Sequence, residues 1–455
     1  MAPLMCSRMN FTGLPMIIKK FGRLHSTHAL RHDKNGMMRK SMHFIRHDPR
    51  DNTDATTERR TGARMNNRIV RSYQYFKVYS TLLGGNQAYI SATVTDCAID
   101  VSLLTEHIYR ELMNLLQDSG FQIVHERIFA SLEFEQSILM AREQVLGSLG
   151  LPGASPYTFI QGNPVAGRGL AGIQLRAYKP EHSSDKIWTI FEQDRAVGRG
   201  WTRNGASFRM LQNIYGSNAG SDRYHQACDM FDRAQEILKK EGLSFKNVLR
   251  TWIYLSRILD WYGEFNRARN ARFTEFGLLG LSEKENREAE QIYLPASTGI
   301  LGENPLGAVS VMDVFAVAPN SKNISIAQTT GVQQMSPYRY GSAFSRAVTL
   351  KEADVTHILL SGTASIDEHG KTVHIDDMRA QIRKTFSVVK ALIEKEGASL
   401  QDINEATVFL KDERDIDLYW DVANELDVTD LPAVFMVADV CRVDLLFEID
   451  AAIAF

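Results

Sequence analysis

The chain has 455 residues, of which 44% are hydrophobic and 23% are charged, a balance typical of a globular protein with a large buried core. Its formal net charge of -2 creates no general field that would attract nucleic acid or an anionic membrane, so we expect neither partner. The four cysteines stand apart, without a C-x-x-C pair. This spacing argues against a zinc site or a disulfide framework and favours a reducing, cytoplasmic location. No apolar run approaches the roughly 18 residues that span a bilayer.

Residues 1–64 differ in composition from the rest of the chain. They hold five of the twelve histidines, and no acidic residue precedes Asp33. No hydrophobic periodicity indicates a helix or strand here, so we predict a disordered basic tail. An organelle transit peptide, or a reading frame extended upstream of Met65, are the alternatives.

An internal repeat organises the remainder. EGLSFKNVLRTWIYLSR, at 241–257, matches EGASLQDINEATVFLKD, at 396–412. Each copy follows a helix predicted from apolar residues spaced three and four apart. Gly242 and Gly397 lie where that helix ends, and Gly397 is where a left-handed C-cap is favoured. A short strand, a second helix and a Leu-Pro-Ala segment that opens two further strands follow in both copies.

A weaker third copy lies near the front of the chain. A helix with apolar residues over 104–115 ends at Gly120, and a strand and a second helix over 133–149 follow. The order β-β-(β)-α-β-α-β-β therefore occurs three times. A mixed sheet with both helices on one face leaves its other face exposed. We expect an α+β (α/β) fold in which three such units bury these faces as a pseudotrimer around a barrel-like core, which is compatible with a monomer. The predicted units cover residues 65–184, 185–319 and 320–455.

The last unit resembles the RidA (YjgF) superfamily in SGTASID, the helix ending KEGAS, the strand INEATVFLKD and the closing segment FEIDAAIA. RTWIYL, WYGEFNRAR, LPASTGI, YGSAFSRA and ADVCRVDLLFEID are similar to stretches of the chorismatases. The resemblance covers 185–455 well and 66–184 by pattern. It implies RidA/chorismate-mutase-like units with ligand clefts between them. It also implies a hydrolase, without cofactor or metal, that releases pyruvate from the enolpyruvyl ether of chorismate or a related small carboxylate.

The same resemblance implies that Glu448 is the general acid and that Cys441, seven residues earlier, lies beside the substrate ring. In the sequence itself, Phe447 and Ile449 alternate with Glu448 and Asp450, so the two pairs face opposite sides of a strand. Burial in so apolar a strand raises the pKa of a carboxyl toward the range of a useful acid, and an inter-repeat salt bridge is the alternative. Cys441 either lines the pocket or is a small buried filler, and we do not propose it as a nucleophile.

Cationic side chains are expected to hold the carboxylates of such a substrate. Arg250, which begins RTWIYL, and Arg346, in YGSAFSRA, are the predicted substrate-binding residues, with solvated surface arginines as the alternative. Tyr340 is predicted to donate its hydroxyl to a carboxylate or ether oxygen, unless it only packs.

Two other functions remain open. RidA imine deaminases carry an arginine directly after Pro-Ala, where it clamps the substrate carboxylate. Here that position holds Val434, and Ser297 in the middle copy. Neither side chain replaces a guanidinium fork, which argues against enamine/imine deaminase activity. A non-catalytic small-molecule binding or regulatory protein of the same fold is the other alternative.

Overall fold

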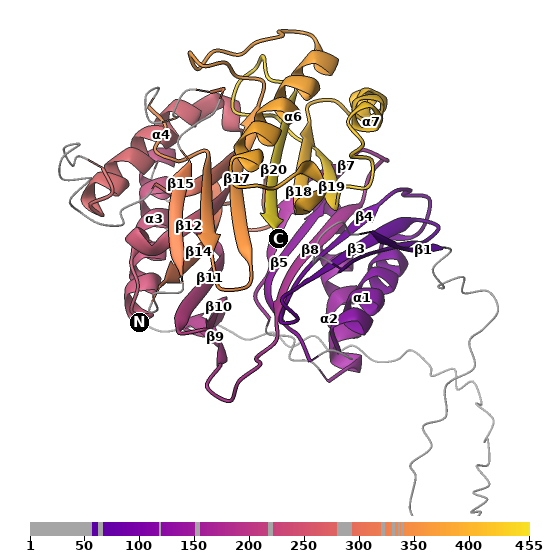
Figure 1. Cartoon of the computed structure of the whole chain (residues 1–455), viewed down its shortest axis with the longest axis vertical. Helices are drawn as coiled ribbons and strands as arrows, with labels where there is room; N and C mark the ends of the chain where they lie inside the picture. The colour runs from indigo at the N-terminus through magenta and orange to yellow at the C-terminus, as the bar shows by residue number, and fades with distance from the viewer. Residues whose placement is uncertain are drawn as a thin grey trace, which may run out of the picture. The chain divides into compact units, whose positions relative to one another are not determined.

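The computed structural model describes residues 57–61, 67–117, 120–150, 155–216, 222–279, 294–319, 324–329, 333–334, 337 and 341–455. These ranges contain three β-sheets and six α-helices (Figure 1). The predicted α+β class is therefore confirmed. Within the predicted tail, Thr57–Thr61 form the strand β1, and the rest of that tail lies outside the described residues.

The first sheet has the strand order β1-β2-β3-β4-β8-β5-β6. After β1, its strands are β2 (Asn67–Ser72), β3 (Phe76–Leu83), β4 (Gln87–Val94), β8 (Leu170–Tyr178), β5 (Gln122–Ala130) and β6 (Thr158–Gln161). Its helices are α1 (Val101–Gln117) and α2 (Glu135–Ser148).

The second sheet has the order β13-β12-β14-β11-β10-β9. Its strands are β13 (Ala296–Leu301), β12 (Val248–Leu255), β14 (Ser310–Ala318), β11 (Ala206–Tyr215), β10 (Arg195–Arg203) and β9 (Ile187–Glu192). Its helices are α3 (Arg223–Lys240) and α4 (Ile258–Glu275).

The third sheet has the order β15-β16-β17-β20-β18-β19-β7. Its strands are β15 (Ser325–Thr329), β16 (Ala347–Lys351), β17 (Thr356–Ala364), β20 (Phe447–Ala454), β18 (Ile403–Leu410), β19 (Ala433–Val437) and β7 (Asn163–Pro164). Its helices are α6 (Met378–Glu394) and α7 (Ile416–Glu425).

One five-strand arrangement recurs in the three sheets. The orders β3-β4-β8-β5-β6, β10-β11-β14-β12-β13 and β16-β17-β20-β18-β19 correspond strand by strand. In each, the last two strands are parallel and the other pairs are antiparallel. The glycines predicted to end the first helices, Gly120, Gly242 and Gly397, have positive φ angles of 71°, 77° and 84°, which suits the left-handed end of a helix.

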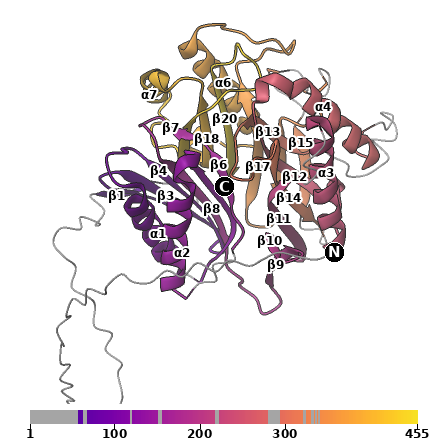
Figure 2. The same ribbon diagram turned by 180° about the vertical axis from the view of Figure 1, so that it is seen from behind.

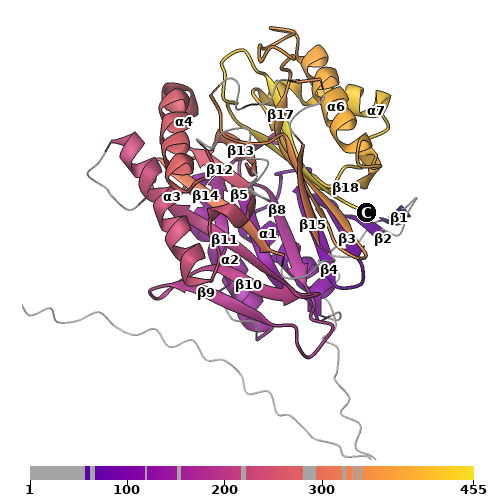
Figure 3. The same ribbon diagram turned by 60° about the vertical axis from the view of Figure 1, so that its left-hand side comes forward.

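Each helix pair covers the outer face of its own sheet, and the opposite faces of the sheets turn inward (Figures 1, 2 and 3). Three apolar clusters fill the spaces between sheets and helices, and a fourth draws residues from all three sheets. With both faces covered, β12, β18 and β20 are buried at every residue.

Among the described residues, strand pairing joins the sheets at only two short places. The two-residue strand β7, from the first part of the chain, pairs with β19, and Ala296 forms an isolated bridge with Ser345. The described strands thus do not close into one barrel, and the expected barrel-like core is not formed as a continuous sheet. In the part of the chain that the structure describes, no helix is long and apolar enough to cross a membrane.

Candidate functional site

A pocket of about 760 Å³, including its open mouth, lies between elements of the second and third sheets. We call it the Glu448 pocket. Side chains reach it from α4, β13, β17, β20 and the segments before β16 and β20. Its lining comprises Tyr262, Asn266, Arg269, Ser297, Gly299, Ser342, Phe344, Arg346, Gly362, Ala364, Ile366, Cys441, Arg442 and Glu448.

Strand alternation turns Glu448 toward this pocket. Phe447 and Ile449 pack in the cluster between the third sheet and its helices, so Glu448 faces the other way, as predicted. Ala364 of β17 is paired with Glu448, and the carboxyl end of the side chain lies against Gly362 of the same strand, where a Cβ atom would lie 2.0 Å from Oε1. Gly362 lies in an irregularity of the β17–β20 pairing between Leu360 and Thr363. This glycine therefore makes room for the carboxyl group.

The environment of Glu448 favours its protonated form. The residue is only 4% exposed, and burial, together with the Asp450 carboxylate on the same strand face, raises its pKa from 4.5 to about 8. Arg250 and Arg346 act in the opposite direction but do not outweigh the burial. Neither Glu448 oxygen has a hydrogen bond or ion pair with another described residue. The salt-bridge alternative thus finds no partner in the described part of the chain.

A pKa of about 8 makes Glu448 a proton donor at neutral pH. At pH 7 such a carboxyl is roughly 90% protonated, whereas one with its ordinary pKa is protonated well below 1% of the time. The pocket therefore presents an acid ready to donate.

Arg250 lies behind the pocket instead of lining it. It is only 1% exposed, so the surface alternative is wrong. Its Nη2 donates to Thr298 Oγ1 at 2.5 Å and to Asp450 Oδ2 at 3.2 Å, and Thr298 Oγ1 itself donates to Asp450 Oδ2 at 2.8 Å. Nη1 donates to the backbone oxygen of Thr251 at 2.9 Å. These contacts direct the guanidinium to Asp450, and Arg250 is not among the residues that line the pocket.

Arg346 does line the pocket and is also only 1% exposed. Two further guanidinium groups join it, from Arg269 of α4 and from Arg442. The Arg269 guanidinium lies 5.3 Å from the centre of the Phe344 ring, and Nη1 of Arg442 donates to the oxygen of Gly370 at 2.9 Å. Three guanidinium groups therefore line the pocket together with one largely protonated acid.

The residues supplied by α4 were not identified from the sequence. Tyr262, Asn266 and Arg269 follow one another at spacings of four and three, which places them on one helix face. That polar spacing within WYGEFNRARNARF was the available signal. This spacing predicts that the three side chains share one helix face, but it does not predict which sheet that face packs against.

Cys441 lines the pocket, as one of its two predicted interpretations requires. Burial, and secondarily the nearby Glu448, raises the pKa of its thiol to about 12. The thiol is therefore neutral at physiological pH, in keeping with a wall residue. Tyr340 lies outside the described residues.

The two positions that lack the deaminase arginine have different surroundings. Ser297 lines the Glu448 pocket, and its hydroxyl accepts a hydrogen bond from Thr251 Oγ1 at 2.9 Å. Val434 is fully buried in the apolar cluster shared by the three sheets. It packs so closely that a Cβ atom on Gly172 would lie 2.7 Å from it. Among the described residues, no group of three or more His, Cys, Asp or Glu side chains could hold a metal ion.

Comparison with known proteins places the chain. The family model described as Endoribonuclease L-PSP matches residues 341–455, which include most of the third sheet with its helices. The chain is 26% identical over 233 residues to a chorismatase from Streptomyces rapamycinicus, a match that covers 47% of this chain and 65% of that protein. Residues 341–455 thus resemble the Endoribonuclease L-PSP family, and the chain is similar to a chorismatase.

A second relative is a 3-hydroxybenzoate synthase from Streptomyces hygroscopicus, 25% identical over 241 residues, with 48% of this chain and 66% of that protein covered. The chain thus spans slightly less than two thirds of the length of both curated relatives. A chorismatase crystal structure aligns with 73% of this chain and 92% of its own, with 16% identity and a TM-score of 0.49.

Proposed function

We propose that residues 65–184, 185–319 and 320–455 form an internal pseudotrimer in which the last two units enclose the Glu448 pocket. The support is a cyclic set of contacts from one shared strand position. Asp313 of the second unit hydrogen-bonds His125 of the first at 2.9 Å, and Asp450 of the third accepts from Arg250 of the second at 3.2 Å. Gln174 of the first unit donates to the oxygen of Ala406 in the third at 2.6 Å, which completes the cycle.

We propose further that the chain is a chorismatase-like hydrolase that acts on the enolpyruvyl ether of chorismate or a related small carboxylic acid. The observation that carries this proposal is the buried Glu448 carboxyl, with a pKa near 8, facing a pocket lined by three arginines. Guanidinium groups bind carboxylates through paired, charge-assisted hydrogen bonds, so the pocket suits an anionic substrate. The curated relatives named chorismatase and 3-hydroxybenzoate synthase point to the same substrate class. The predicted cytoplasmic location stays a prediction.

In the proposed reaction, Glu448 donates its proton to the methylene carbon of the enolpyruvyl group. The electrons of the C=C bond form the new C–H bond and leave an oxocarbenium-like centre at the ether carbon. Water, or a ring hydroxyl of the substrate, attacks that centre, and its proton returns to the Glu448 carboxylate. With water, the hemiketal collapses to pyruvate and the ring alcohol. The enol ether supplies the electrons, so the reaction needs no oxidant or cofactor.

The arginines have separate roles in this scheme. Arg346, Arg269 and Arg442 line the pocket and would hold the substrate carboxylates, whereas Arg250 acts through Asp450. A neutral Glu448 adds no repulsion toward an anion that these arginines hold. The acid can thus approach a dianionic substrate in its protonated form.

The test is pyruvate release from chorismate by the purified full chain at pH 7. Glu448→Gln keeps the shape of the side chain and removes its proton, and should lower kcat by roughly 10²–10⁴-fold, the usual contribution of a general acid. The exposed Glu413→Gln is the matched control and should behave as the parent. The parent rate should fall as the pH rises through about 8, because the donor form of Glu448 is lost.

Arg346→Gln should raise KM more than it lowers kcat if this arginine binds the substrate in the ground state. A folded parent that releases no pyruvate would exclude chorismate as the substrate and redirect attention to imine substrates or a binding role. Equal rates for the parent and Glu448→Gln would refute the assignment of the acid. The imine-deaminase alternative is disfavoured because Ser297 occupies the arginine position in this pocket.

A further inference from the structure

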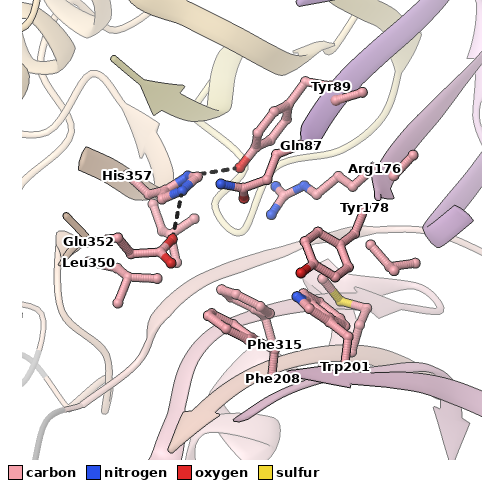
Figure 4. Close-up of a pocket in the computed structure, with 15 residues that line it drawn as sticks. Gln87, Tyr89, Arg176, Tyr178, Trp201, Phe208, Phe315, Leu350, Glu352 and His357 are labelled. Carbon is pink, nitrogen blue, oxygen red and sulfur yellow. Dashed lines mark hydrogen bonds and ion pairs between the residues drawn. The ribbon is translucent and has the colours of Figure 1, made fainter. Parts of the chain in front are cut away.

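A second pocket lies at one end of the contact between the three sheets (Figure 4). We call it the axial pocket. It has an empty volume of about 500 Å³, and its walls come from β4, β5 and β8 of the first sheet, β10, β11 and β14 of the second, and β16 and β17 of the third. It shares no lining residue with the Glu448 pocket.

One side of the axial pocket is aromatic. Trp201 stacks on Phe208 with ring centres 5.3 Å apart and on Phe315 with ring centres 6.1 Å apart. Tyr178 lies 6.2 Å from Trp201 and continues the aromatic surface, as Figure 4 shows. Four rings on one wall favour a planar, apolar ligand, because stacked and edge contacts between rings add to the gain from burying their area.

The facing side carries the guanidinium of Arg176, whose side chain is only 8% exposed. Its Nε and Nη2 donate to Glu405 at 3.2 Å and 2.7 Å, whereas Nη1 has no hydrogen-bond partner among the described residues. Figure 4 shows this guanidinium pointing into the pocket beside Gln87. Nη1 is not one of the fully buried unpaired polar atoms, so an acceptor from a ligand or water can reach it.

The local charges favour an anionic acceptor. The single carboxylate of Glu405 binds both Arg176 and Arg127, whose Nη2 lies 2.8 Å from it, so this cluster has one excess positive charge. Glu352 also lines the pocket, but its charge is matched by an ion pair with Arg203, and Nε2 of His357 lies 3.2 Å away. The acidic wall is therefore neutralised, whereas the Arg176 side is not.

We propose that the axial pocket binds a small aromatic carboxylate. The ring would pack on the Trp201 and Phe315 surface, and the carboxylate would accept from Nη1 of Arg176. The aromatic wall indicates that the ligand carries a ring. The excess positive charge of the Arg176, Arg127 and Glu405 cluster indicates that the ligand is an anion. This site is separate from the Glu448 pocket, and the proposal does not depend on the reaction catalysed there.

The test is calorimetric titration of the full chain with benzoate, beside benzyl alcohol and propionate. Benzyl alcohol keeps the ring and lacks the charge, while propionate keeps the charge and lacks the ring. We expect saturable benzoate binding, with both comparison compounds weaker by about tenfold or more, because each loses one of the two interactions. No saturable benzoate binding, or equal binding of benzyl alcohol, would overturn the proposal.

Two variants assign the binding to the axial pocket. Leu350→Phe and Val124→Phe enlarge lining side chains from different sheets and fill the space, so each should weaken benzoate binding by about tenfold or more. If one of them fails to fold, the other decides. Arg346→Gln alters the Glu448 pocket and should leave benzoate binding within about twofold of the parent. Loss of binding in Arg346→Gln with retention in both filled variants would place benzoate in the Glu448 pocket and refute the inference.

Discussion

Replacing Glu448 with glutamine should stabilise the protein at alkaline pH. The folded state raises the pKa of Glu448 from 4.5 to about 8, so the folded protein holds a proton that the unfolded chain releases between these values. The stability associated with this group is fully present below the unfolded pKa and is lost as the pH rises through about 8. A shift of this size corresponds to an upper limit of roughly 4–5 kcal/mol at pH 9, where the unfolded carboxyl is fully ionised.

Glutamine carries no titrating proton, so Glu448→Gln escapes this loss. Local relaxation around a buried charge reduces the effect, and we expect a difference of about 2–4 kcal/mol at pH 9. For a folded body of about 400 residues, this difference raises Tm by roughly 3–5 °C relative to the parent. At pH 5, where Glu448 is protonated in the folded state, the two proteins should melt within about 1 °C of each other.

The assay is thermal unfolding of parent, Glu448→Gln and Glu413→Gln at several pH values between 5 and 9. Glu413 is exposed, so Glu413→Gln should have the same Tm as the parent at each pH. Parallel melting curves for Glu448→Gln and parent across this range would refute the reasoning, because they would show that Glu448 titrates alike in the folded and unfolded states.

Three further substitutions test the site. Gly362→Ala should reduce pyruvate release by about tenfold or more while costing little stability. The reason is that the new Cβ would displace the flexible end of the Glu448 side chain, and an unchanged kcat would contradict this geometry. Val434→Arg should destabilise the fold by about 3 kcal/mol or more and produce no deamination of imino acids, because Val434 is fully buried among apolar side chains. Thermal melting and ammonia-release assays check this, and a stable variant that deaminates imino acids would contradict it. Cys441→Ser should keep kcat within about threefold, since a thiol with a pKa near 12 is not a nucleophile, and inactivity of a folded variant would reopen that role.

The local elements of this fold could be predicted from the sequence. Apolar spacing identified the helices, and Gly120, Gly242 and Gly397 identified their ends, because a positive φ is a property of the backbone at one residue. The side of the strand on which Glu448 lies followed from alternation alone, since neighbouring strand residues face opposite sides. The family resemblance singled out this glutamate among the other carboxylates.

The contacts between units could not be predicted in this way. Arg250 was predicted to bind the substrate because it begins RTWIYL. Its guanidinium instead donates to Asp450, 200 residues later in the chain. The α4 residues of the pocket and the packing of Val434 against Gly172 likewise depend on which faces meet.

The sequence by itself predicted a strand and helix order that recurs along the chain, the helix ends and an acid facing away from the helices. Only the tertiary structure decided that this acid lies without a partner among the described residues, against Gly362 and in a pocket that Arg269 of α4 also lines. It also brought Trp201 of the second sheet and Arg176 of the first to opposite walls of the axial pocket. The physical reason is that secondary structure follows from nearby residues, whereas the charge and burial of a side chain depend on distant segments that fold against it.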